Sequence, residues 1–407
     1  MTRLVVLGGS GASTPELAEA LTAWPGGVAR RPPLMVVLQG RSADKLALVA
    51  GAFRERLVAL GGPDIEVETS VDLERALDGA DAVLNQVRVG GLAARAFDES
   101  FPRAFGIPGE ETMGPGGFAN ALRTVPALAP TWAAVARHAP RALVVNLTNP
   151  SGIVVAVAAR TAGLTPVSVC DSPVTLTESI AACLGRPLAE VRSQYLGCNH
   201  AGWWVAADET ELAEVGELAT GISAEEVATV GALPAPYGRY YLAPDRIAAA
   251  QATGPTRAAQ LQELEARQLK AYASGSTDAP PRRGAVWYSK AVVPLLDAWW
   301  NGSAVPEILG LVSDGSLPGI PAGVVVERAT DVTARRALSP RPAPALPPLP
   351  AAILSSHAAY ESLVVDALST GAPRRALVRA LATNRMVRDL DQAAGLVDTI
   401  LAGSPGG

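Results

Sequence analysis

The sequence predicts an α/β protein that begins with a doubly wound parallel sheet of the Rossmann type and continues into an α+β part. Three observations support this prediction. Short β-branched runs alternate with longer helical patterns over roughly the first 170 residues, which is the pattern of βαβ units. The first run enters a glycine-rich turn that leads directly into a helical pattern. After these units, the alternation fades into long helices and scattered strands.

Six short apolar runs are the expected parallel strands, because each is bounded by turn residues. They are Leu4–Leu7, Leu34–Leu38, Ile65–Thr69, Ala82–Gln86, Ala142–Asn146 and Pro166–Val169. Two long crossover helices are expected between the first three strands. One covers Pro15–Trp24, with Thr14 as its N-cap, and the other covers Ser42–Leu60, with Ser42 as its N-cap.

The second part follows the sixth strand, and we expect one domain over residues 1–168 and another over residues 169–407. Helices are predicted over Thr256–Ser274 and Ala351–Leu368, and a strand over Gly323–Glu327. The proline-rich stretch Leu338–Pro350 is expected to be an extended surface connection or an edge strand, because proline has no N–H to donate within a sheet.

Composition excludes several classes of partner. The chain of 407 residues carries 34 Lys and Arg against 39 Asp and Glu, a formal charge of −5, which argues against nucleic acid and anionic membranes. No apolar run approaches the roughly 20 residues of a membrane span. Three cysteines are too few for a disulfide framework, and the start of the chain lacks the pattern of a signal peptide. We therefore expect a soluble, cytoplasmic protein with reduced cysteines and a small-molecule partner.

The glycine-rich turn is the first candidate site. The segment from Gly8 to Ser13 lies between a strand and a helix, where free N–H groups and the positive helix end suit a pyrophosphate. This setting predicts dinucleotide binding by Gly8, Gly9, Ser10, Gly11 and Ser13. The alternative is a turn that is rich in glycine for steric reasons alone.

The end of the second strand bears on the choice of dinucleotide. An Asp or Glu that holds a ribose diol is usual at this place, but the sequence reads Gln39-Gly40-Arg41-Ser42. Arg41 and Ser42 suit the 2′-phosphate of NADP, since guanidinium and hydroxyl groups donate to a dianion. The alternative is a surface arginine followed by a helix-capping serine.

Polar residues follow the fourth strand, at the sheet edge where ligands of such folds bind. Asn85 ends this strand and is predicted to contact the dinucleotide. Arg88 and Arg95 would present two cations on one face if the segment up to Glu99 is helical, and a solvated charged face is the alternative. Gly109–Phe118 is too rich in glycine for a helix, and its polar content indicates a functional loop.

Three further strand ends carry candidate ligands. Asn146–Pro150 ends a strand with two amides, Cys170 and Asp171 follow the next strand, and Cys198–His200 ends a third. Cys170 and His200 can converge on one divalent metal and leave positions open for substrate oxygens. A purely structural Cys and His are the alternative.

Together these segments resemble glycoside hydrolase family 4, the NAD- and metal-dependent glycosidases, and most closely its 6-phospho-β-glucosidase-like members. The resemblance covers nearly the whole chain. Its motifs are, in order, Thr14–Leu17, Asn85–Glu99, Gly109–Phe118, Ala121–Pro126, Asn146–Gly152, Cys170–Pro173, Asn199-His200, Tyr237–Tyr241, Thr256–Ala258 and Val387–Asp391.

The resemblance implies a Rossmann-like domain followed by a substrate and metal domain, as in lactate and malate dehydrogenases, and chemistry by redox-assisted elimination. In this chemistry the nicotinamide of NAD or NADP removes hydride from C3 of the sugar, a base removes the C2 proton, and the C1 group departs. Water then adds at C1 and the hydride returns. A divalent metal, expected to be Mn²⁺, stabilises the enediolate. We expect a glycoside substrate, with or without a 6-phosphate, and a homodimer or homotetramer.

Several roles are implied by position in the family motifs. Cys170 and His200 correspond to the metal ligands, Asn149 to the amide that orients the sugar hydroxyls, and Tyr237 to the base at C2. Such a tyrosine needs nearby positive charge, because its ordinary pKa is about 10. The alternative for Tyr237 and its neighbouring tyrosines is an amphipathic helix that packs aromatic rings.

Further residues correspond to substrate-binding positions. Arg95 and Arg257 match positions associated with the sugar 6-phosphate, and Glu111 matches an acidic position of the family loop. Asp171 stands where β-specific relatives commonly carry Asn and some α-specific relatives carry an Asp that protonates the leaving group, so the anomeric specificity stays open. Cys198 would crowd His200 if both lie on one strand face.

Two rival functions follow from the same residues. One is an NAD(P)-dependent dehydrogenase of a free sugar or cyclitol, which needs the hydride geometry but no leaving group. The other is a redox-sensing nucleotide-binding protein, against which the intact set of Cys170, His200, Asn149 and Tyr237 argues.

Overall fold

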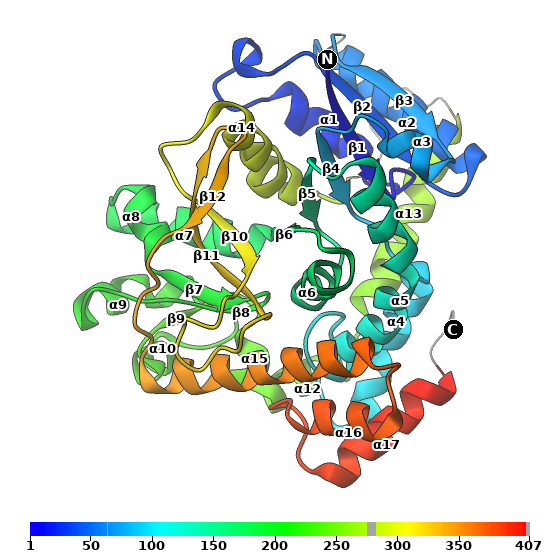
Figure 1. The fold of residues 1–407 in the computed structure, drawn as a ribbon. Helices are drawn as coiled ribbons and strands as arrows, with labels where there is room; N and C mark the ends of the chain where they lie inside the picture. Colours follow the sequence, from blue (N-terminus) through cyan, green and yellow to red (C-terminus); the bar gives the residue numbers. More distant parts are fainter. Residues whose placement is uncertain (63, 275–281, 404–407) are drawn as a thin grey trace.

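The structure is a computed structural model that describes residues 1–62, 64–274 and 282–403. Within these residues one mixed sheet of 12 strands runs through the molecule, in the order β3-β2-β1-β4-β5-β6-β10-β11-β7-β8-β9, with β12 beside β11. Figure 1 shows the N-terminal strands at the top of the view and the later strands at the left.

The first six strands are parallel and follow the strand order of a dinucleotide-binding sheet. Their bounds, in sheet order, are β3 (Glu66–Ser70), β2 (Leu34–Gln39), β1 (Thr2–Leu7), β4 (Ala82–Asn85), β5 (Leu143–Asn146) and β6 (Val167–Ser168). All six lie where the sequence predicts them, so the predicted Rossmann-like parallel sheet is confirmed.

Helices cover both faces of this sheet (Figure 1). Those of the first half are α1 (Pro15–Thr22), α2 (Ala43–Ala59), α3 (Leu73–Leu77), α4 (Gly91–Ser100), α5 (Gly114–His138) and α6 (Ser151–Ala162), with short 3₁₀ turns η1 (Val28–Arg30) and η2 (Phe101–Phe105). In β1, Leu4 and Val6 are buried on the side of α1 and α2, whereas Val5 and Leu7 are buried on the side of α5 and α6. Because strand side chains alternate, this apolar run contributes to two separate cores.

The second half extends the same sheet with antiparallel strands. These are β7 (Tyr195–Cys198), β8 (Ala201–Trp204), β9 (Leu233–Pro234), β10 (Glu307–Val312), β11 (Val325–Thr333) and β12 (Ala337–Pro340). β10 joins the parallel strands because Gly310 pairs with Ser168 of β6, and a Cβ at position 310 would lie 2.7 Å from the Ser168 Cβ. The domain boundary expected after residue 168 therefore falls where the sheet continues.

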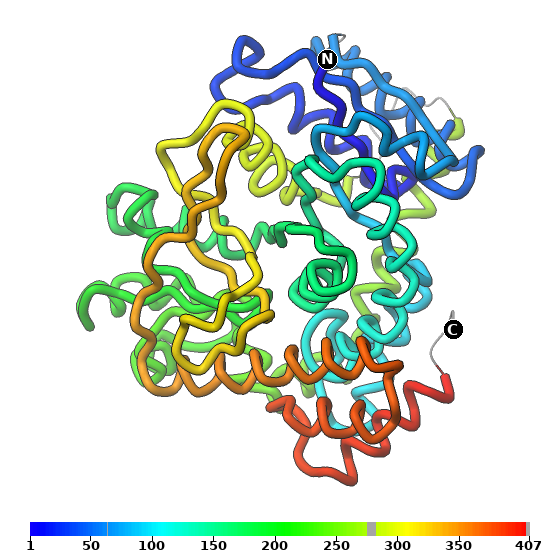
Figure 2. Tube along the Cα trace, in the orientation of Figure 1, coloured from blue at the N-terminus to red at the C-terminus, as the bar shows by residue number. Residues whose placement is uncertain are grey.

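The helices of the second half surround these strands. They are α7 (Asp171–Leu184), α8 (Leu188–Ser193), α9 (Glu209–Val215), α10 (Ala224–Val230), α11 (Arg239–Leu242), α12 (Pro244–Gln251), α13 (Arg257–Ser274), α14 (Val293–Asn301), α15 (Pro348–Ser369), α16 (Arg374–Ala382) and α17 (Leu390–Gly403), with η3 (Gly216–Leu218) and the π-helical η4 (Tyr288–Val292). Helix α13 returns to the N-terminal half (Figure 2). There Glu265 of α13 forms an ion pair with Lys45 of α2 (2.8 Å). Elements of both halves therefore stabilise the first.

Most of the other predicted elements are present. The helices expected over Thr256–Ser274 and Ala351–Leu368 are α13 and α15, and the strand expected over Gly323–Glu327 begins at Val325 instead. The proline-rich stretch opens with the edge strand β12, which pairs only with β11 among the described strands, and ends in the first turn of α15.

One local prediction is confirmed in part and another is wrong. Thr14 is the N-cap residue of α1, but its side chain makes no capping hydrogen bond and its hydroxyl accepts one from Gln86 Nε2 (3.0 Å) instead. Gly109–Phe118 is not a loop throughout, since α5 begins at Gly114. A Cβ at Gly116 would lie 2.1 Å from the carbonyl oxygen of Glu110, so close packing explains this glycine.

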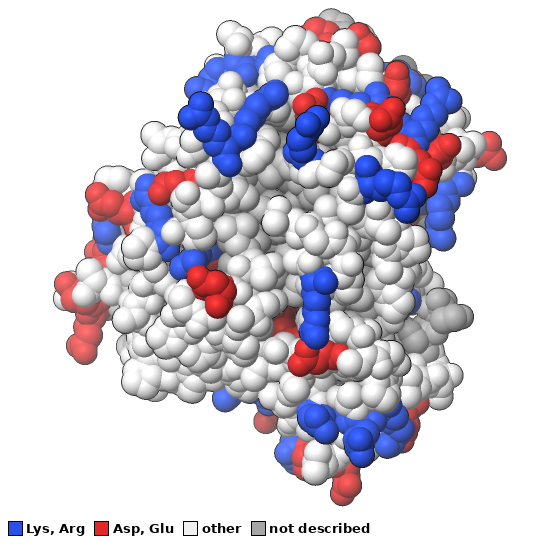
Figure 3. Space-filling model, in the orientation of Figure 1, with Lys and Arg blue, Asp and Glu red and all other residues white. Residues whose placement is uncertain are grey.

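The surface shows no single-sign field on the face drawn in Figure 3, where basic and acidic side chains are intermixed around a broad uncharged area. Among the described helices, none is both long enough and apolar enough to cross a bilayer.

Candidate functional site

The turn between β1 and α1 approaches β2 closely. The Gly9 N–H donates to the Gln39 carbonyl (2.7 Å), and a Cβ on Gly9 would lie 2.8 Å from the Leu38 Cα. Gly8 has a φ of 79°, in the left-handed region that favours glycine. Only glycine at both positions allows the turn to pass so near the neighbouring strand.

The same turn offers donors at the N-terminus of α1. Within the described residues, the N–H groups of Ser10, Ala12 and Ser13 have no hydrogen-bond partner. Unpaired N–H groups and the positive end of a helix form a binding site for phosphate groups. The residues of this turn therefore fit the pyrophosphate of a dinucleotide.

The two residues expected to bind a 2′-phosphate have different surroundings. Ser42 caps α2, because its hydroxyl accepts a hydrogen bond from the Lys45 N–H (3.3 Å). Arg41 is exposed and has no hydrogen bond or ion pair within the described ranges. Arg41 thus remains available to a ligand, whereas Ser42 already has a structural role.

Asn85 is fully buried at the carboxyl end of β4. Its amide nitrogen donates to Asn146 Oδ1 (2.7 Å) and Thr148 Oγ1 (3.0 Å). The side chain therefore ties the ends of β4 and β5 together, and the predicted contact with a dinucleotide stays a prediction.

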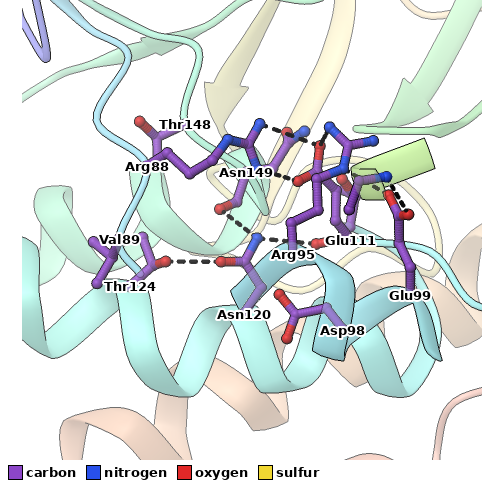
Figure 4. A network of polar contacts seen from close by, with 12 residues as sticks. Arg88, Val89, Arg95, Asp98, Glu99, Glu111, Asn120, Thr124, Thr148 and Asn149 are labelled. Atoms are coloured by element: carbon purple, nitrogen blue, oxygen red, sulfur yellow. Dashed lines mark hydrogen bonds and ion pairs between the residues drawn. The ribbon is translucent and has the colours of Figure 1, made fainter. Parts of the chain in front are cut away.

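Glu111 lies between two arginines (Figure 4). It forms ion pairs with Arg88, in the loop before α4, and with Arg95 of α4 (2.8 Å). Burial opposes ionisation of Glu111, but the two guanidinium groups outweigh burial and lower its pKa to about 2. The helix-face arrangement predicted for Arg88 and Arg95 is wrong, because α4 begins at Gly91; they meet at one carboxylate instead.

Arg95 also links this cluster to α13. Its Nε donates to Glu99 Oε1 (2.6 Å), and Glu99 Oε2 accepts the N–H of Ala258 (2.8 Å). The neighbouring Arg257 is exposed, and its guanidinium donates to the Gln260 side chain (3.0 Å). The structure therefore brings the backbone of Arg257 near Arg95 but leaves its side chain outside the cluster.

Arg283 is a third cation here, and the sequence reasoning missed it. Its guanidinium lies over the Trp287 ring at 4.8 Å. Burial and the nearby charges of Arg88 and Arg95 lower the pKa of Arg283 to about 10. An arginine beside a glycine carries no recognisable pattern, so only the fold reveals it. Arg283 thus adds a third guanidinium group near Glu111, which already pairs with Arg88 and Arg95.

Asn120 of α5 holds the two loops that border the cluster. Its amide nitrogen donates to the carbonyl oxygens of Glu111 (3.0 Å) and Asn149 (3.0 Å), as Figure 4 shows. The half-buried side-chain amide of Asn149 has no hydrogen bond within the described residues. It is therefore available to bind a hydroxyl group.

Cys170 and Asp171 lie where β6 leads into α7. Cys170 is the N-cap residue, and Asp171 is the first residue of the helix. Burial and the negative charges of Glu327 and Asp171 raise the pKa of the Cys170 thiol. Burial also raises the pKa of Asp171. The Asp171 carboxyl group therefore retains a proton more readily than an exposed aspartate does.

His200 lies in the two-residue turn of the β7–β8 hairpin, since Cys198 pairs with Ala201. Its φ of 67° is unusual for a residue with a side chain and costs about 1–3 kcal/mol. Burial lowers the pKa of His200 to about 3, so its imidazole is neutral at physiological pH. The strain and the protonation state both suit a ligand group that is held in place by the fold.

The crowding predicted for Cys198 does not occur through a shared strand face. His200 is in the turn rather than on the strand, and Cys198 is fully buried in a core cluster with Leu196 and Leu354.

Tyr237 stacks on the ring of His200. The ring centroids are 3.7 Å apart and the planes differ by 1°. Burial and the charges of Glu110 and Cys170 raise the pKa of Tyr237. Its hydroxyl has no hydrogen bond within the described part of the chain, whereas the Tyr241 hydroxyl bonds His357 Nδ1 (2.7 Å). Of these two tyrosines, Tyr237 is therefore the one available to a substrate.

His200 stacks on Tyr237, and Cys170 lies close enough that a negative charge on it would raise the pKa of Tyr237. Over the described ranges, no group of three or more His, Cys, Asp or Glu side chains is arranged to hold a metal ion. A thiolate and an imidazole fit a divalent ion whose remaining positions are filled by water or substrate oxygens.

Two family models match the chain. The model described as "Family 4 glycosyl hydrolase" matches residues 35–186, and the model described as "Family 4 glycosyl hydrolase C-terminal domain" matches residues 195–387. A Bacillus subtilis (strain 168) protein named "Probable 6-phospho-beta-glucosidase" is 27% identical over 426 residues, which cover 98% of this chain and 95% of that protein. The two models together span most of the chain.

Solved structures share the fold. A Thermotoga maritima 6-phospho-beta glucosidase, determined with manganese, NAD⁺ and glucose-6-phosphate, has a TM-score of 0.85 at 24% identity and covers 99% of this chain and 98% of its own. A 6-phospho-alpha-glucosidase from gut microorganisms, in complex with NAD and glucose-6-phosphate, has a TM-score of 0.84 at 23% identity, with coverage of 98% and 97%. Malate dehydrogenase from Naegleria fowleri has a TM-score of 0.54 at 13% identity, over 90% of this chain and 98% of its own. The predicted dehydrogenase-like architecture is confirmed.

Proposed function

Because the chain belongs to the family 4 glycosyl hydrolases, we propose that it hydrolyses phosphorylated glucosides by transient oxidation at C3, elimination across C1 and C2, and addition of water. The observation that carries this proposal is the stack of Tyr237 on His200 beside Cys170, in a protein with the parallel sheet of a dinucleotide-binding fold. Hydrolysis by two carboxylates requires neither feature.

The chain's own residues divide the remaining work. When bound, a dinucleotide at the β1–α1 turn and a divalent cation at Cys170 and His200 would supply hydride exchange at C3 and positive charge beside O2 and O3. Tyr237 takes the proton from C2. Because the pKa of Tyr237 is raised, its hydroxyl needs nearby positive charge before it can ionise. The ring of His200 stacks on that of Tyr237, so a cation bound to His200 would lie near this hydroxyl. Asn149 orients the sugar hydroxyls with its amide.

The arginine cluster supports a phosphate on the substrate. Arg88 and Arg95 form ion pairs with Glu111, Arg283 lies close enough for its charge to act on the same carboxylate, and guanidinium groups match phosphate oxygens in geometry. We assign the 6-phosphate to this cluster, in which the Arg95 side chain is less exposed than that of Arg88. Arg257 joins it only if its exposed side chain turns away from Gln260.

Asp171 is relevant to the anomeric specificity of the enzyme. Its raised pKa and its place beside Cys170 suit a general acid that protonates the oxygen leaving C1. We propose that Asp171 has this role. Relatives named as α- and as β-glucosidases both resemble the chain, so an assay must decide whether it prefers the α- or the β-anomer.

The choice of dinucleotide depends on Arg41. Its exposed, unengaged guanidinium supports binding of a 2′-phosphate, and no carboxylate stands at the end of β2 to repel one. We propose that Arg41 shifts preference toward NADP. Titration of both dinucleotides into wild type and Arg41→Ala tests this, and an unchanged ratio of affinities would contradict it.

Assays with aryl α- and β-glucosides, each with and without a 6-phosphate, test the function in the presence of Mn²⁺ and either dinucleotide. We expect turnover of a phosphorylated substrate, loss of turnover on chelation, and no net formation of reduced dinucleotide, because the hydride returns. Steady accumulation of reduced dinucleotide without glycoside cleavage would instead indicate a sugar or cyclitol dehydrogenase.

A further inference from the structure

Glu110 is a buried carboxylate next to the candidate metal ligands that none of the roles above explains. It is only 7% exposed, and its Oε2 accepts hydrogen bonds from the backbone N–H groups of Thr112 (2.6 Å) and Met113. Two backbone donors on one oxygen fix the carboxylate plane, because neither donor can move without moving the start of α5. The other oxygen, Oε1, is therefore held in one direction.

That direction leads to His200. Glu110 Oε1 lies 3.9 Å from His200 Nδ1, a nitrogen that is fully buried and has no hydrogen-bond partner within the described residues. The adjacent Glu111 cannot replace Glu110, since its carboxylate is occupied by Arg88 and Arg95. Glu110 is thus the acceptor toward which this nitrogen faces.

The two ring nitrogens of His200 differ in access. Nδ1 is buried against Glu110, whereas Nε2 makes no hydrogen bond to the described protein and is not among its fully buried polar atoms. The stack on Tyr237 fixes the plane of the His200 ring, and the backbone conformation of the turn fixes the position of the His200 Cα from which the side chain extends. Nε2 is therefore the nitrogen that is free to bind a cation.

We propose that Glu110 is a positioning residue that accepts a hydrogen bond from His200 Nδ1–H, so that the lone pair of Nε2 is presented to a divalent cation shared with Cys170. The separation is about 1 Å longer than a hydrogen bond, so the proposal requires the two groups to approach by that amount when the cation binds. A carboxylate behind a metal-binding imidazole fixes its tautomer and raises its basicity. This inference rests on the proposed metal site of Cys170 and His200.

The tautomer of His200 provides a test that is independent of turnover. The chain has 3 histidines, so protein labelled with ¹⁵N in histidine gives few signals, and the His200 signal is assigned from a His200→Ala spectrum. At about pH 8.5, where carboxylates are ionised, we expect metal-free wild type to show the Nδ1–H tautomer. In Glu110→Gln, the amide oxygen can still accept from the backbone N–H groups of Thr112 and Met113, while its NH₂ group faces His200. We expect this variant to show the Nε2–H tautomer.

Metal affinity provides the second readout. Calorimetric titration with Mn²⁺ is expected to show binding about 10- to 100-fold weaker in Glu110→Gln than in wild type. Glu327→Gln is the matched control, because it removes another buried carboxylate whose oxygens bond Asn199 (3.0 Å) and Tyr195 (3.2 Å). We expect Glu327→Gln to remove a negative charge near the site but to leave the tautomer of His200 unchanged.

The outcomes separate this inference from the proposed function. If Mn²⁺ binding depends on Cys170 and His200 but Glu110→Gln keeps both the affinity and the tautomer, Glu110 has no positioning role. If wild type binds no Mn²⁺, or Cys170→Ala and His200→Ala bind it as wild type does, the metal site itself is wrong. Folding of each variant is verified by its thermal unfolding midpoint, and Glu110→Asp provides a further variant that keeps the charge but shortens the reach.

Discussion

Cys170 and His200 would respond differently to pH as ligands of one cation. Burial lowers the pKa of His200 to about 3, so no proton competes at its ring near neutrality. Burial raises the pKa of the Cys170 thiol, so a cation must displace one proton there. The proton released on binding therefore comes from the thiol.

This difference predicts the pH dependence of metal binding. Between about pH 7.5 and 9, the apparent affinity for Mn²⁺ should tighten about tenfold per pH unit, because one proton is exchanged for the cation. Calorimetry in buffers of different ionisation enthalpy measures the number of protons directly. Cys170→Ser should weaken binding and flatten this dependence. A release of two protons would show that a second group, such as Tyr237, ionises with the cation.

Tyr237 is expected to carry the C2 proton. In Tyr237→Phe, turnover should fall about 10²- to 10⁴-fold, the usual contribution of a general base, while hydride abstraction at C3 persists. Reduced dinucleotide should then accumulate after substrate is added. Solvent deuterium should enter C2 of the product in wild type. Tyr241→Phe is the comparison, because its hydroxyl is bonded to His357 (2.7 Å). Full activity of Tyr237→Phe with loss in Tyr241→Phe would reassign the base.

Asp171 can be tested through the leaving group. Asp171→Asn cannot donate a proton, so hydrolysis of a methyl glycoside should fall about 10²- to 10⁴-fold. A nitrophenyl glycoside needs little protonation and should lose much less. Equal losses for both substrates would show that Asp171 acts in binding rather than as an acid.

At the scale of elements, the start of α5 depends on backbone contacts that only glycine permits. A Cβ on Gly116 would lie 2.1 Å from the Glu110 carbonyl oxygen and 2.3 Å from that of Asp98. The loop that carries Glu110 and Glu111 is thereby pressed onto the first turn of the helix.

We expect Gly116→Ala to lower the free energy of unfolding by about 1–3 kcal/mol or more, as overpacking does, and to weaken metal binding through Glu110. Gly51 is the matched control, because it lies inside α2 and its Cβ would meet no atom within 4 Å. Gly51→Ala should stabilise by about 0.5–1 kcal/mol through reduced backbone entropy of the unfolded chain. Urea unfolding followed by tryptophan fluorescence measures both. A neutral Gly116→Ala would mean that the loop can move away from the helix.

At the scale of the whole molecule, the junction of the two sheet halves contains a buried ion pair. Arg192 of α8 binds Glu307 of β10 (3.0 Å) and the Pro306 carbonyl (2.8 Å). Burial raises the pKa of Glu307 even though Arg192 opposes the shift. Strand β10 is the one that pairs with β6, so this ion pair stabilises the continuity of the sheet.

Arg192→Met should therefore destabilise the protein by about 3–5 kcal/mol near pH 8, because it leaves a buried charge uncompensated. The loss should shrink at lower pH. A folded-state pKa above the unfolded value means that the native state binds the proton more tightly, so its stability falls as pH rises from the unfolded pKa to the folded one. Denaturant midpoints of wild type and Arg192→Met, compared at pH 8 and at a lower pH, measure this change in the destabilisation. The double variant with Glu307→Met should recover most of the loss, and the absence of recovery would contradict the pairing.

Local periodicity, capping residues and glycine in the sequence predict the parallel sheet, the turn at Gly8–Ser13 and the positions of α2, α13 and α15. The sequence also provided Cys170, His200 and Tyr237 as candidates. Contacts between distant segments were decided only by the tertiary structure. Gly114–Phe118 is helical although it is rich in glycine; Gly116 and Gly117 are needed because backbone carbonyl groups of distant and preceding residues approach them closely, which no local pattern encodes.

The site shows the same division. Arg88 and Arg95 meet through Glu111, and Arg283 arrives from a segment far along the chain. The stack of Tyr237 on His200 and the approach of Glu110 to Nδ1 join residues from three separate loops and turns. The sequence named residue types suited to the chemistry, but their geometry and pKa values depend on burial and on through-space charge, which exist only once the chain has folded.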